Sequence, residues 1–179
     1  MPGRHAPSPR LDHLIIQNVA REAVRAFTER FRSAAALLGV DPGSIREDEC
    51  PLSLALNRMG TWAQTGGAYP LSAKPLPLAM DVFTARRVER ELQPSLSSEL
   101  GVMLGAARAR ALLVECRPVA VVDLAALASV GPRRVRQLLD ERRLVRVGDS
   151  KRRDALLEPL SAILWLHEVG VPGFDVLVK

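Results

Sequence analysis

The stretch from Val122 to Leu139, VDLAALASVGPRRVRQLL, constrains the fold of this chain more than any other segment. Apolar residues at helical spacing lead into a Ser-Val-Gly-Pro turn, and a second apolar stripe follows at Val135, Leu138 and Leu139. Two helices this short can bury their stripes only by packing against each other at a steep angle. The pattern therefore predicts a helix-turn-helix unit, with Ala125 as the small residue where the second helix crosses the first.

A small shared core is predicted between these two helices, filled by Leu124, Ala128, Val130, Val135 and Leu138. Asp123 is expected to cap the N-terminus of the first helix, because its carboxylate can accept hydrogen bonds from first-turn amides. Pro132 suits the first position of the second helix, where its missing N–H group breaks no helical hydrogen bond. We expect this second helix to run from Pro132 to about Arg142.

The second helix carries polar and basic residues off its apolar stripe, namely Arg133, Arg134, Arg136, Gln137 and Asp140. Arginine is the best reader of guanine edges and glutamine pairs with adenine, so these residue types suit readout of DNA bases in the major groove. The first turn of such a helix points deepest into the groove. We therefore expect Arg133, Arg134 and Gln137 near bases, and Arg136 near a base or a phosphate.

The chain after the second helix is predicted to form a short β-hairpin, or wing. Its apolar residues are Leu144, Val145 and Val147, and the segment Gly148-Asp149-Ser150 would form the turn. The basic residues at the tip are Lys151, Arg152 and Arg153. We assign these three to phosphate contacts and add the two arginines at the end of the second helix, Arg142 and Arg143.

The basic excess of the chain is concentrated in this region. Residues 132–153 contain nine Lys or Arg and three Asp or Glu, a net charge of +6, whereas the whole chain of 179 residues carries +5. The remainder of the chain is therefore close to neutral. A local excess of this kind is stronger support for polyanion binding than a basic pI alone.

The apolar pattern of residues 122–139 resembles the one shared by helix-turn-helix DNA-binding proteins. Ser129 stands where that pattern has a turn glycine, and we expect Gly131 to supply some of the missing backbone freedom. The later string ALLEPLSAILWLHEVGVPGF resembles the closing segment of small bacterial excisionase-like or MerR-like proteins, with a helix expected from Leu160 to about Val169. The resemblance covers roughly residues 97–174 and implies a winged helix-turn-helix regulator of a bacterium or a phage.

The first half of the chain shows helical patterns but no family that we recognise. Residues 1–10 are expected to form a flexible tail, and helices are predicted at 11–38, 51–64 and 80–93, with a linker at 66–77. A further helix should start after Ser97 or Ser98 and reach about Cys116. Its predicted buried side consists of Leu100, Met103, Leu104, Ala107, Ala111, Leu112 and Val114. The long first helix could pack within the chain or pair with a second subunit.

Composition narrows the class of protein. Apolar residues make up 47% and aromatic residues 4% of the chain, and the dominance of Ala, Leu and Val favours helix packing over a β-sandwich. Cys50 and Cys116 have no companions at metal-ligand spacing, so we expect buried, reduced thiols rather than a zinc site. No apolar run reaches the length of about 20 residues that a membrane-spanning helix needs. A cytoplasmic, nucleoid-associated location is expected.

Enzymatic function is a poor fit to the sequence. The histidines are His5, His13 and His167, and no Ser/His/Asp or Cys/His arrangement is legible around them. The acidic cluster at 47–49 could hold a cation, but the preference of helix starts for negative charge explains it more simply. Trp62 and Tyr69 could flank a small-molecule cleft, although ordinary packing is the favoured interpretation. We expect no cofactor and no metal.

The sequence thus predicts a mostly α-helical protein with a small β-hairpin wing. Its predicted parts are a flexible tail at 1–10, a helical region at 11–94 for packing or self-association, and a winged helix-turn-helix domain at 97–179. The predicted function is sequence-specific binding of double-stranded DNA by a homodimer, with no membrane contact. The alternatives are an adaptor that uses the same fold to bind another protein, and a nucleoid-type binder without sequence preference.

Overall fold

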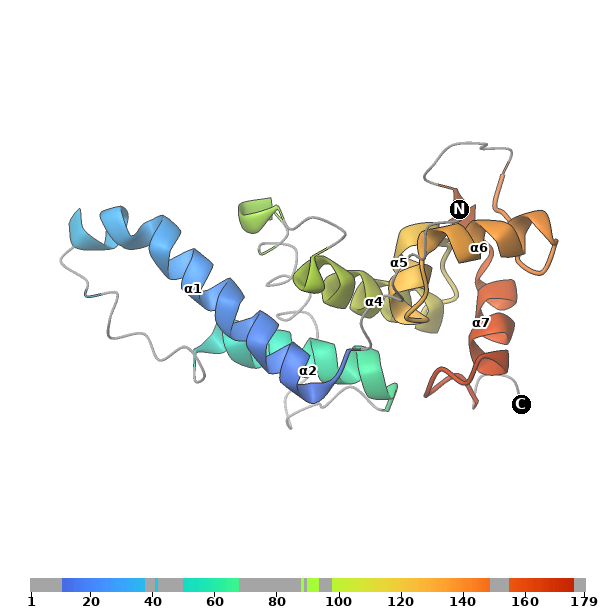
Figure 1. Ribbon diagram of the computed structural model, residues 1–179, viewed down its shortest axis with the longest axis horizontal. Coiled ribbons are helices and arrows are strands. Elements are labelled where there is room, and N and C mark those ends of the chain that lie inside the picture. The colour runs from blue at the N-terminus through green and yellow to red at the C-terminus, as the bar shows by residue number, and fades with distance from the viewer. Residues whose placement is uncertain are drawn as a thin grey trace, which may run out of the picture.

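The computed structural model describes residues 11–37, 41, 50–67, 88, 90–93, 98–148 and 155–175. The fold is mostly helical, with one small antiparallel sheet of two strands (Figure 1). In chain order the elements are α1 (His13–Leu37), α2 (Pro51–Thr65), α4 (Glu99–Val114), β1 (Val119–Ala120), α5 (Val121–Leu127), α6 (Pro132–Asp140), β2 (Leu156–Leu157) and α7 (Pro159–Glu168). The predicted helices at 11–38 and 51–64 are confirmed with small shifts at their ends. The predicted tail, most of the linker at 66–77 and most of the helix at 80–93 lie outside the described residues.

Helices α1 and α2 pack against each other and against α4, which lies in the middle of the molecule, and α1 extends beyond α2 (Figure 1). Gly60 of α2 faces side chains of both α1 and α4. A Cβ atom at this position would lie 2.7 Å from Cγ2 of Ile16 and 2.9 Å from Sδ of Met103, so only glycine fits. Pro51 occupies the first turn of α2, as predicted. Trp62 is buried, which agrees with packing rather than a cleft.

Helix α4 is the central element of the fold, because it packs against α1, α2, α5 and α7. Ser98, one of the two candidates from the sequence, caps the helix. Its Oγ accepts a hydrogen bond of 3.0 Å from the amide of Gly101. The helix ends at Val114, two residues earlier than predicted. Val114 is 58% exposed, so its predicted place on the buried side is wrong. Cys116 is exposed and Cys50 half-buried, so the prediction of two buried thiols is also wrong.

A buried arginine joins α4 to the end of α2 and to the segment that follows α7. Arg110 is 2% exposed and donates hydrogen bonds from Nε and Nη2 to the carbonyl oxygen of Ala63, at 3.2 and 3.0 Å. Its guanidinium lies 4.8 Å from the ring centroid of Phe174, at cation–π distance. Burial lowers the pKa of Arg110 to about 10, so the group remains charged at neutral pH. One side chain thus connects the end of α2, α4 and the segment after α7.

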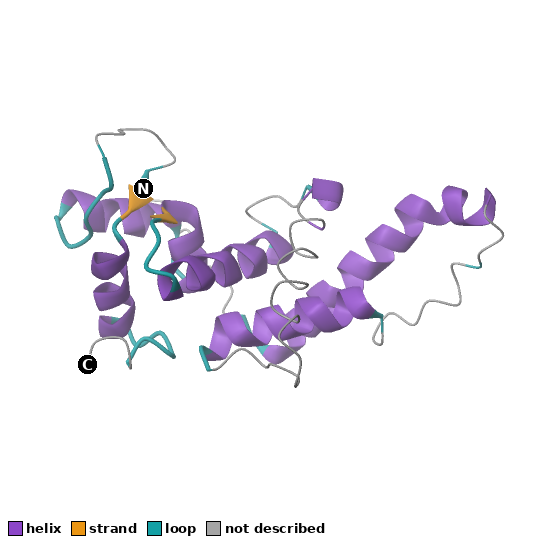
Figure 2. Ribbon diagram, turned by 180° about the vertical axis from the view of Figure 1, so that it is seen from behind, coloured by secondary structure: helices purple, strands orange, loops and turns teal. Residues whose placement is uncertain are grey.

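The small sheet lies at the same end of the molecule as α5, α6 and α7 (Figure 2). Val119 of β1 pairs with Leu157 of β2, and Ala120 with Leu156. Residues 145–147 run along the other side of β2. The amide of Val147 donates to the carbonyl of Leu156 at 2.8 Å, and Arg146 forms a bridge with Leu157. The chain after Val147 therefore turns back and pairs with residues 145–147, as the hairpin prediction expects. The sequence did not indicate that β2 also pairs with β1.

Helix α7 agrees with the predicted closing helix. Glu158 caps it, since its carboxylate accepts hydrogen bonds from the amides of Leu160 at 2.9 Å and Ser161 at 2.6 Å. The side chains of Trp165 and Leu166 are buried against the core. His167 is exposed and lies 3.1 Å from a carboxylate oxygen of Asp175. In the part of the chain that is described, no helix is both long and apolar enough to cross a membrane.

Candidate nucleic-acid interface

The short helices α5 and α6 pack against each other as the apolar pattern predicts. Leu124, Ala125, Val135 and Leu138 are all buried, with exposed fractions of 1% or less. Ala128 and Val130 are partly buried and pack against the same core. The burial of Val135 and Leu138 against the core fixes the orientation of the face that α6 turns outward.

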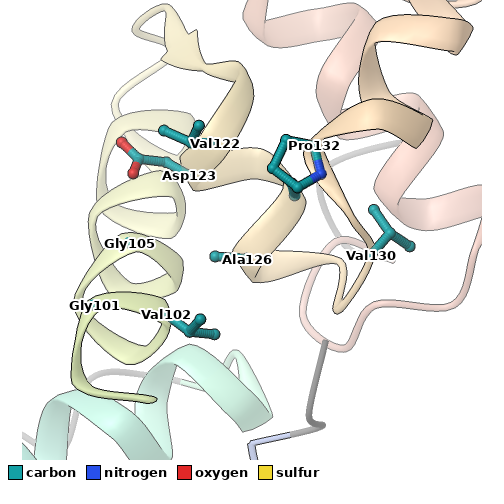
Figure 3. A pocket seen from close by; sticks show the side chains of 9 residues that line it. Gly101, Val102, Gly105, Val122, Asp123, Ala126, Val130 and Pro132 are labelled. Carbon is teal, nitrogen blue, oxygen red and sulfur yellow. The ribbon is translucent and has the colours of Figure 1, made fainter. Parts of the chain in front are cut away.

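Asp123 does not cap α5, and the sequence prediction for it is wrong. The helix begins at Val121 directly after β1, and its N-cap is Ala120, which makes no side-chain hydrogen bond. Asp123 instead turns back toward α4 (Figure 3) and receives hydrogen bonds from Nε and Nη2 of Arg108, at 2.8 and 2.7 Å. The carboxylate is almost completely buried, whereas the side chain of Arg108 is 39% exposed. This two-point ion pair attaches α5 to α4.

The contact between α4 and α5 is close because the facing residues are small. A Cβ atom on Gly105 would lie 3.2 Å from Oδ1 of Asp123 and 3.4 Å from Cβ of Ala126. Gly101, Gly105, Val122 and Pro132 border a pocket of about 60 Å³ between α4, α5 and the start of α6 (Figure 3). Its lining is mainly apolar and its Asp123 carboxylate is already paired, so we attribute the pocket to imperfect packing of small residues.

The turn between α5 and α6 departs from the sequence prediction in one respect. Ser129 has a φ of 54°, which is the left-handed conformation that favours glycine, whereas Gly131 has a φ of −73°. Ser129 therefore adopts the glycine conformation itself, and Gly131 supplies no unusual backbone freedom. The amide of Val130 donates to the carbonyl of Ala125 at 2.9 Å and closes the end of α5. Pro132 is the first residue of α6, as predicted.

Replacing Ser129 by glycine should stabilise the protein by about 0.5 kcal/mol, because relief of the left-handed strain exceeds the added freedom of the unfolded chain. Urea denaturation measures the change. Gly131→Ser is the matched control: no atom lies within 4 Å of its added Cβ, and serine suits the N-cap conformation found there. Destabilisation by Gly131→Ser, with no gain from Ser129→Gly, would show that the turn differs from the one described.

Helix α6 presents its polar residues to solvent and its apolar residues to the core. Arg133, Arg134, Arg136 and Gln137 are all exposed, while Val135 and Leu138 between them are buried. The helix ends at Asp140, two residues before the predicted end, and Arg142 follows with a φ of 59°. Arg142 and Arg143 are exposed in this closing turn. The structure thus brings the predicted residues of the second helix to one surface.

Some of these basic residues are paired with carboxylates. Nη1 of Arg134 lies 3.6 Å from Oε1 of Glu141, and Nε2 of Gln137 donates to the same oxygen at 2.7 Å. Nη2 of Arg143 lies 2.5 and 2.6 Å from the two carboxylate oxygens of Glu168 on α7. Within the described residues, no ion pair is found for Arg133, Arg136 or Arg142. The cationic charge of α6 is therefore least compensated at Arg133 and Arg136.

The predicted tip cluster of Lys151, Arg152 and Arg153 lies outside the described residues. The sequence reasoning also left out three residues near the surface of α6. Arg146 is exposed in the extended segment 145–147, which bridges to β2. Glu141 follows Gln137 at the i,i+4 spacing of helical side-chain pairs, which could have indicated the contact. Glu168 and Arg143 are 25 positions apart in the sequence, so no local pattern indicates that they pair.

The comparisons with known proteins add no relative to this description. No protein-family model, no curated protein and no solved structure matches the chain.

Proposed function

We propose that the chain binds double-stranded DNA in a sequence-specific manner, as a transcriptional regulator of a bacterium or a phage. In this proposal α5 and α6 form the helix-turn-helix, and the paired segments 145–147 and 156–158 form the base of the wing. The observation that carries the proposal is the outward face of α6. Its side chains Arg133, Arg136 and Gln137 are exposed on a helix that Val135 and Leu138 anchor in the core.

The chemistry of this face suits the major groove of DNA, which is wide enough to admit an α-helix. Arginine can donate two hydrogen bonds to guanine, and glutamine can both donate to and accept from adenine. No side chain caps the N-terminus of α6. Pro132 has no N–H and the amide of Arg134 donates to the carbonyl of Gly131, so the amide of Arg133 and the positive end of the helix dipole can face a phosphate. Contacts to the DNA bases and to a DNA phosphate would thus come from the same end of the helix.

The residues that flank α6 are suited to phosphate contacts. Arg142 lies in the turn that closes the helix, and Arg146 lies on the strand bridged to β2. Lys151, Arg152 and Arg153 follow in the sequence between this strand and β2. Contacts of this type supply affinity and orientation but carry no sequence information. In our proposal they hold the duplex while α6 reads it.

We further propose that the protein acts as a homodimer. A single helix-turn-helix unit has a small interface, and two copies on half-sites one helical turn apart give the affinity that regulators require. The long helix α1 is suited to the subunit contact, because it extends beyond α2 and away from α6 (Figure 1). A dimer of this kind would prefer a DNA site with two-fold symmetry.

Selection of binding sites from a random duplex pool, followed by salt titration on selected and random duplexes, tests this function. We expect an enriched sequence with two related half-sites, bound at least about 1,000-fold more tightly than random DNA at physiological salt. Equal loss of affinity on both duplexes with rising salt would indicate a binder without sequence preference. Absence of binding at low salt would refute DNA binding and favour an adaptor that contacts another protein.

A further inference from the structure

We infer that Glu141 is a positioning residue that orients the side-chain amide of Gln137 for adenine and holds Arg134 away from the base edges. This inference rests on the proposed function and identifies the role of individual side chains within it. It differs from the sequence prediction, which placed Arg134 beside Arg133 and Gln137 as a base-reading residue.

The geometry converges on a single carboxylate oxygen. Oε1 of Glu141 accepts a hydrogen bond of 2.7 Å from Nε2 of Gln137 and lies 3.6 Å from Nη1 of Arg134. The backbone of Glu141 is held in place, because this residue is the C-cap of α6 and its amide donates to the carbonyl of Gln137 at 2.9 Å. One residue at the end of the helix therefore restrains two of the four side chains that the sequence assigns to DNA reading.

The hydrogen bond to Glu141 determines which way the amide of Gln137 faces. Nε2 uses one of its two hydrogens on Glu141, and the other hydrogen and Oε1 remain available. The reversed amide would place Oε1 against the carboxylate, where two acceptors repel each other. With the observed orientation Gln137 offers one donor and one acceptor, which matches N7 and the N6 amino group of adenine. Guanine presents two acceptors at the same edge and is a poor match.

Arg134 has a different role in this arrangement. Its charge is partly compensated by Glu141, while Arg133 and Arg136 have no ion pair within the described residues. On a helix with 3.6 residues per turn, Arg133 and Gln137 share the face opposite Val135 and Leu138. Arg134 lies at the edge of that face, on the same side as Glu141. Arg133, Arg136 and Gln137 are therefore the base-reading set, and Arg134 supports it.

The two substitutions Glu141→Gln and Glu141→Ala separate charge from orientation. Glu141→Gln keeps an acceptor for Gln137 but releases Arg134, so all duplexes should bind several-fold more tightly and the adenine preference should persist. The slope of log affinity against log salt should steepen by about 0.9, the value for one more phosphate contact. Glu141→Ala also removes the acceptor, and the preference for adenine at one base pair should fall about 10-fold.

Asp140 provides the matched control. It is an exposed carboxylate next to Glu141, and no hydrogen bond or ion pair within the described residues involves it. Asp140→Ala removes the same charge, so it should tighten binding to all duplexes while the adenine preference stays intact. In the free protein, NMR signals of the Gln137 side-chain amide should move on Glu141→Ala and remain in place on Asp140→Ala.

The failure of this inference differs from failure of the proposed function. If Gln137→Ala abolishes the preference at one base pair while Glu141→Ala leaves it unchanged, Glu141 positions nothing and DNA reading by α6 stands. If Glu141→Ala and Asp140→Ala shift the Gln137 amide signals equally, the contact itself is refuted without reference to DNA. If the wild-type protein shows no base preference, the proposed function fails, and this inference fails with it.

Discussion

Replacing Arg110 by alanine is expected to lower the free energy of unfolding by about 3 kcal/mol. The substitution removes both hydrogen bonds to the carbonyl of Ala63 and the contact with Phe174, and it leaves a cavity where a long side chain was buried. These losses exceed the stabilisation gained by no longer burying a charge. The lowered pKa of Arg110 reflects the cost of burying that charge. Urea denaturation followed by circular dichroism measures the change.

Arg110→Met is the matched control for this prediction, because methionine fills much of the same volume without charge. It should cost no more than about 1.5 kcal/mol, since relief from burying a cation offsets much of the lost hydrogen bonding. Equal destabilisation by the alanine and methionine variants would show that the hydrogen bonds to Ala63 dominate. A loss below about 0.5 kcal/mol for Arg110→Ala would contradict the buried position of this side chain.

The packing of α5 and α6 could be predicted from the sequence because its signal is local. The residues that form the core between them, from Leu124 to Leu138, occur at helical spacing within one short segment, and all become buried or partly buried. The start of α6 was equally legible, because Pro132 has a restricted backbone angle that suits the first position of a helix. Local periodicity and local backbone chemistry were sufficient here.

Asp123 and Arg110 could not be placed in the same way, because their partners lie elsewhere in the chain. A carboxylate near a helix start usually caps it, but Asp123 has its partner Arg108 fifteen positions earlier, across the α4–α5 contact. Arg110 resembles a solvated cation in the sequence and becomes buried only when α2 and Phe174 close over it. The two-residue strand β1 was missed because it is too short to show alternation.

The candidate site was therefore predicted in its composition but not in its internal contacts. The exposed arginines of α6 follow from the position of the apolar stripe. The contact between Gln137 and Glu141, and the pair formed by Arg143 and Glu168, depend on the closing turn of α6 and on the position of α7. These contacts decide which cations remain uncompensated, and charge counting in the sequence treats all cations alike.

The double replacement of Arg133 and Arg136 by alanine is expected to weaken binding to the preferred duplex by at least about 30-fold. Each arginine can contribute a contact worth about 1–3 kcal/mol, and both side chains are exposed without an ion pair to any described residue. Because neither side chain is part of the core, the thermal stability should change little. Titration of labelled duplex by fluorescence anisotropy at fixed salt measures the affinity.

The control for this pair is the double variant Arg21→Ala and Arg90→Ala, which removes the same formal charge from exposed positions outside α6. Arg21 is part of α1, and α1 lies at the opposite end of the molecule from α6 (Figure 1). Only a small, sequence-independent loss is expected, because charges farther away than about 10 Å are largely screened at 0.1 M salt. Equal losses in the two double variants would mean that net charge, rather than the face of α6, drives binding. An unchanged affinity on loss of Arg133 and Arg136 would refute their assignment as the main DNA contacts of α6.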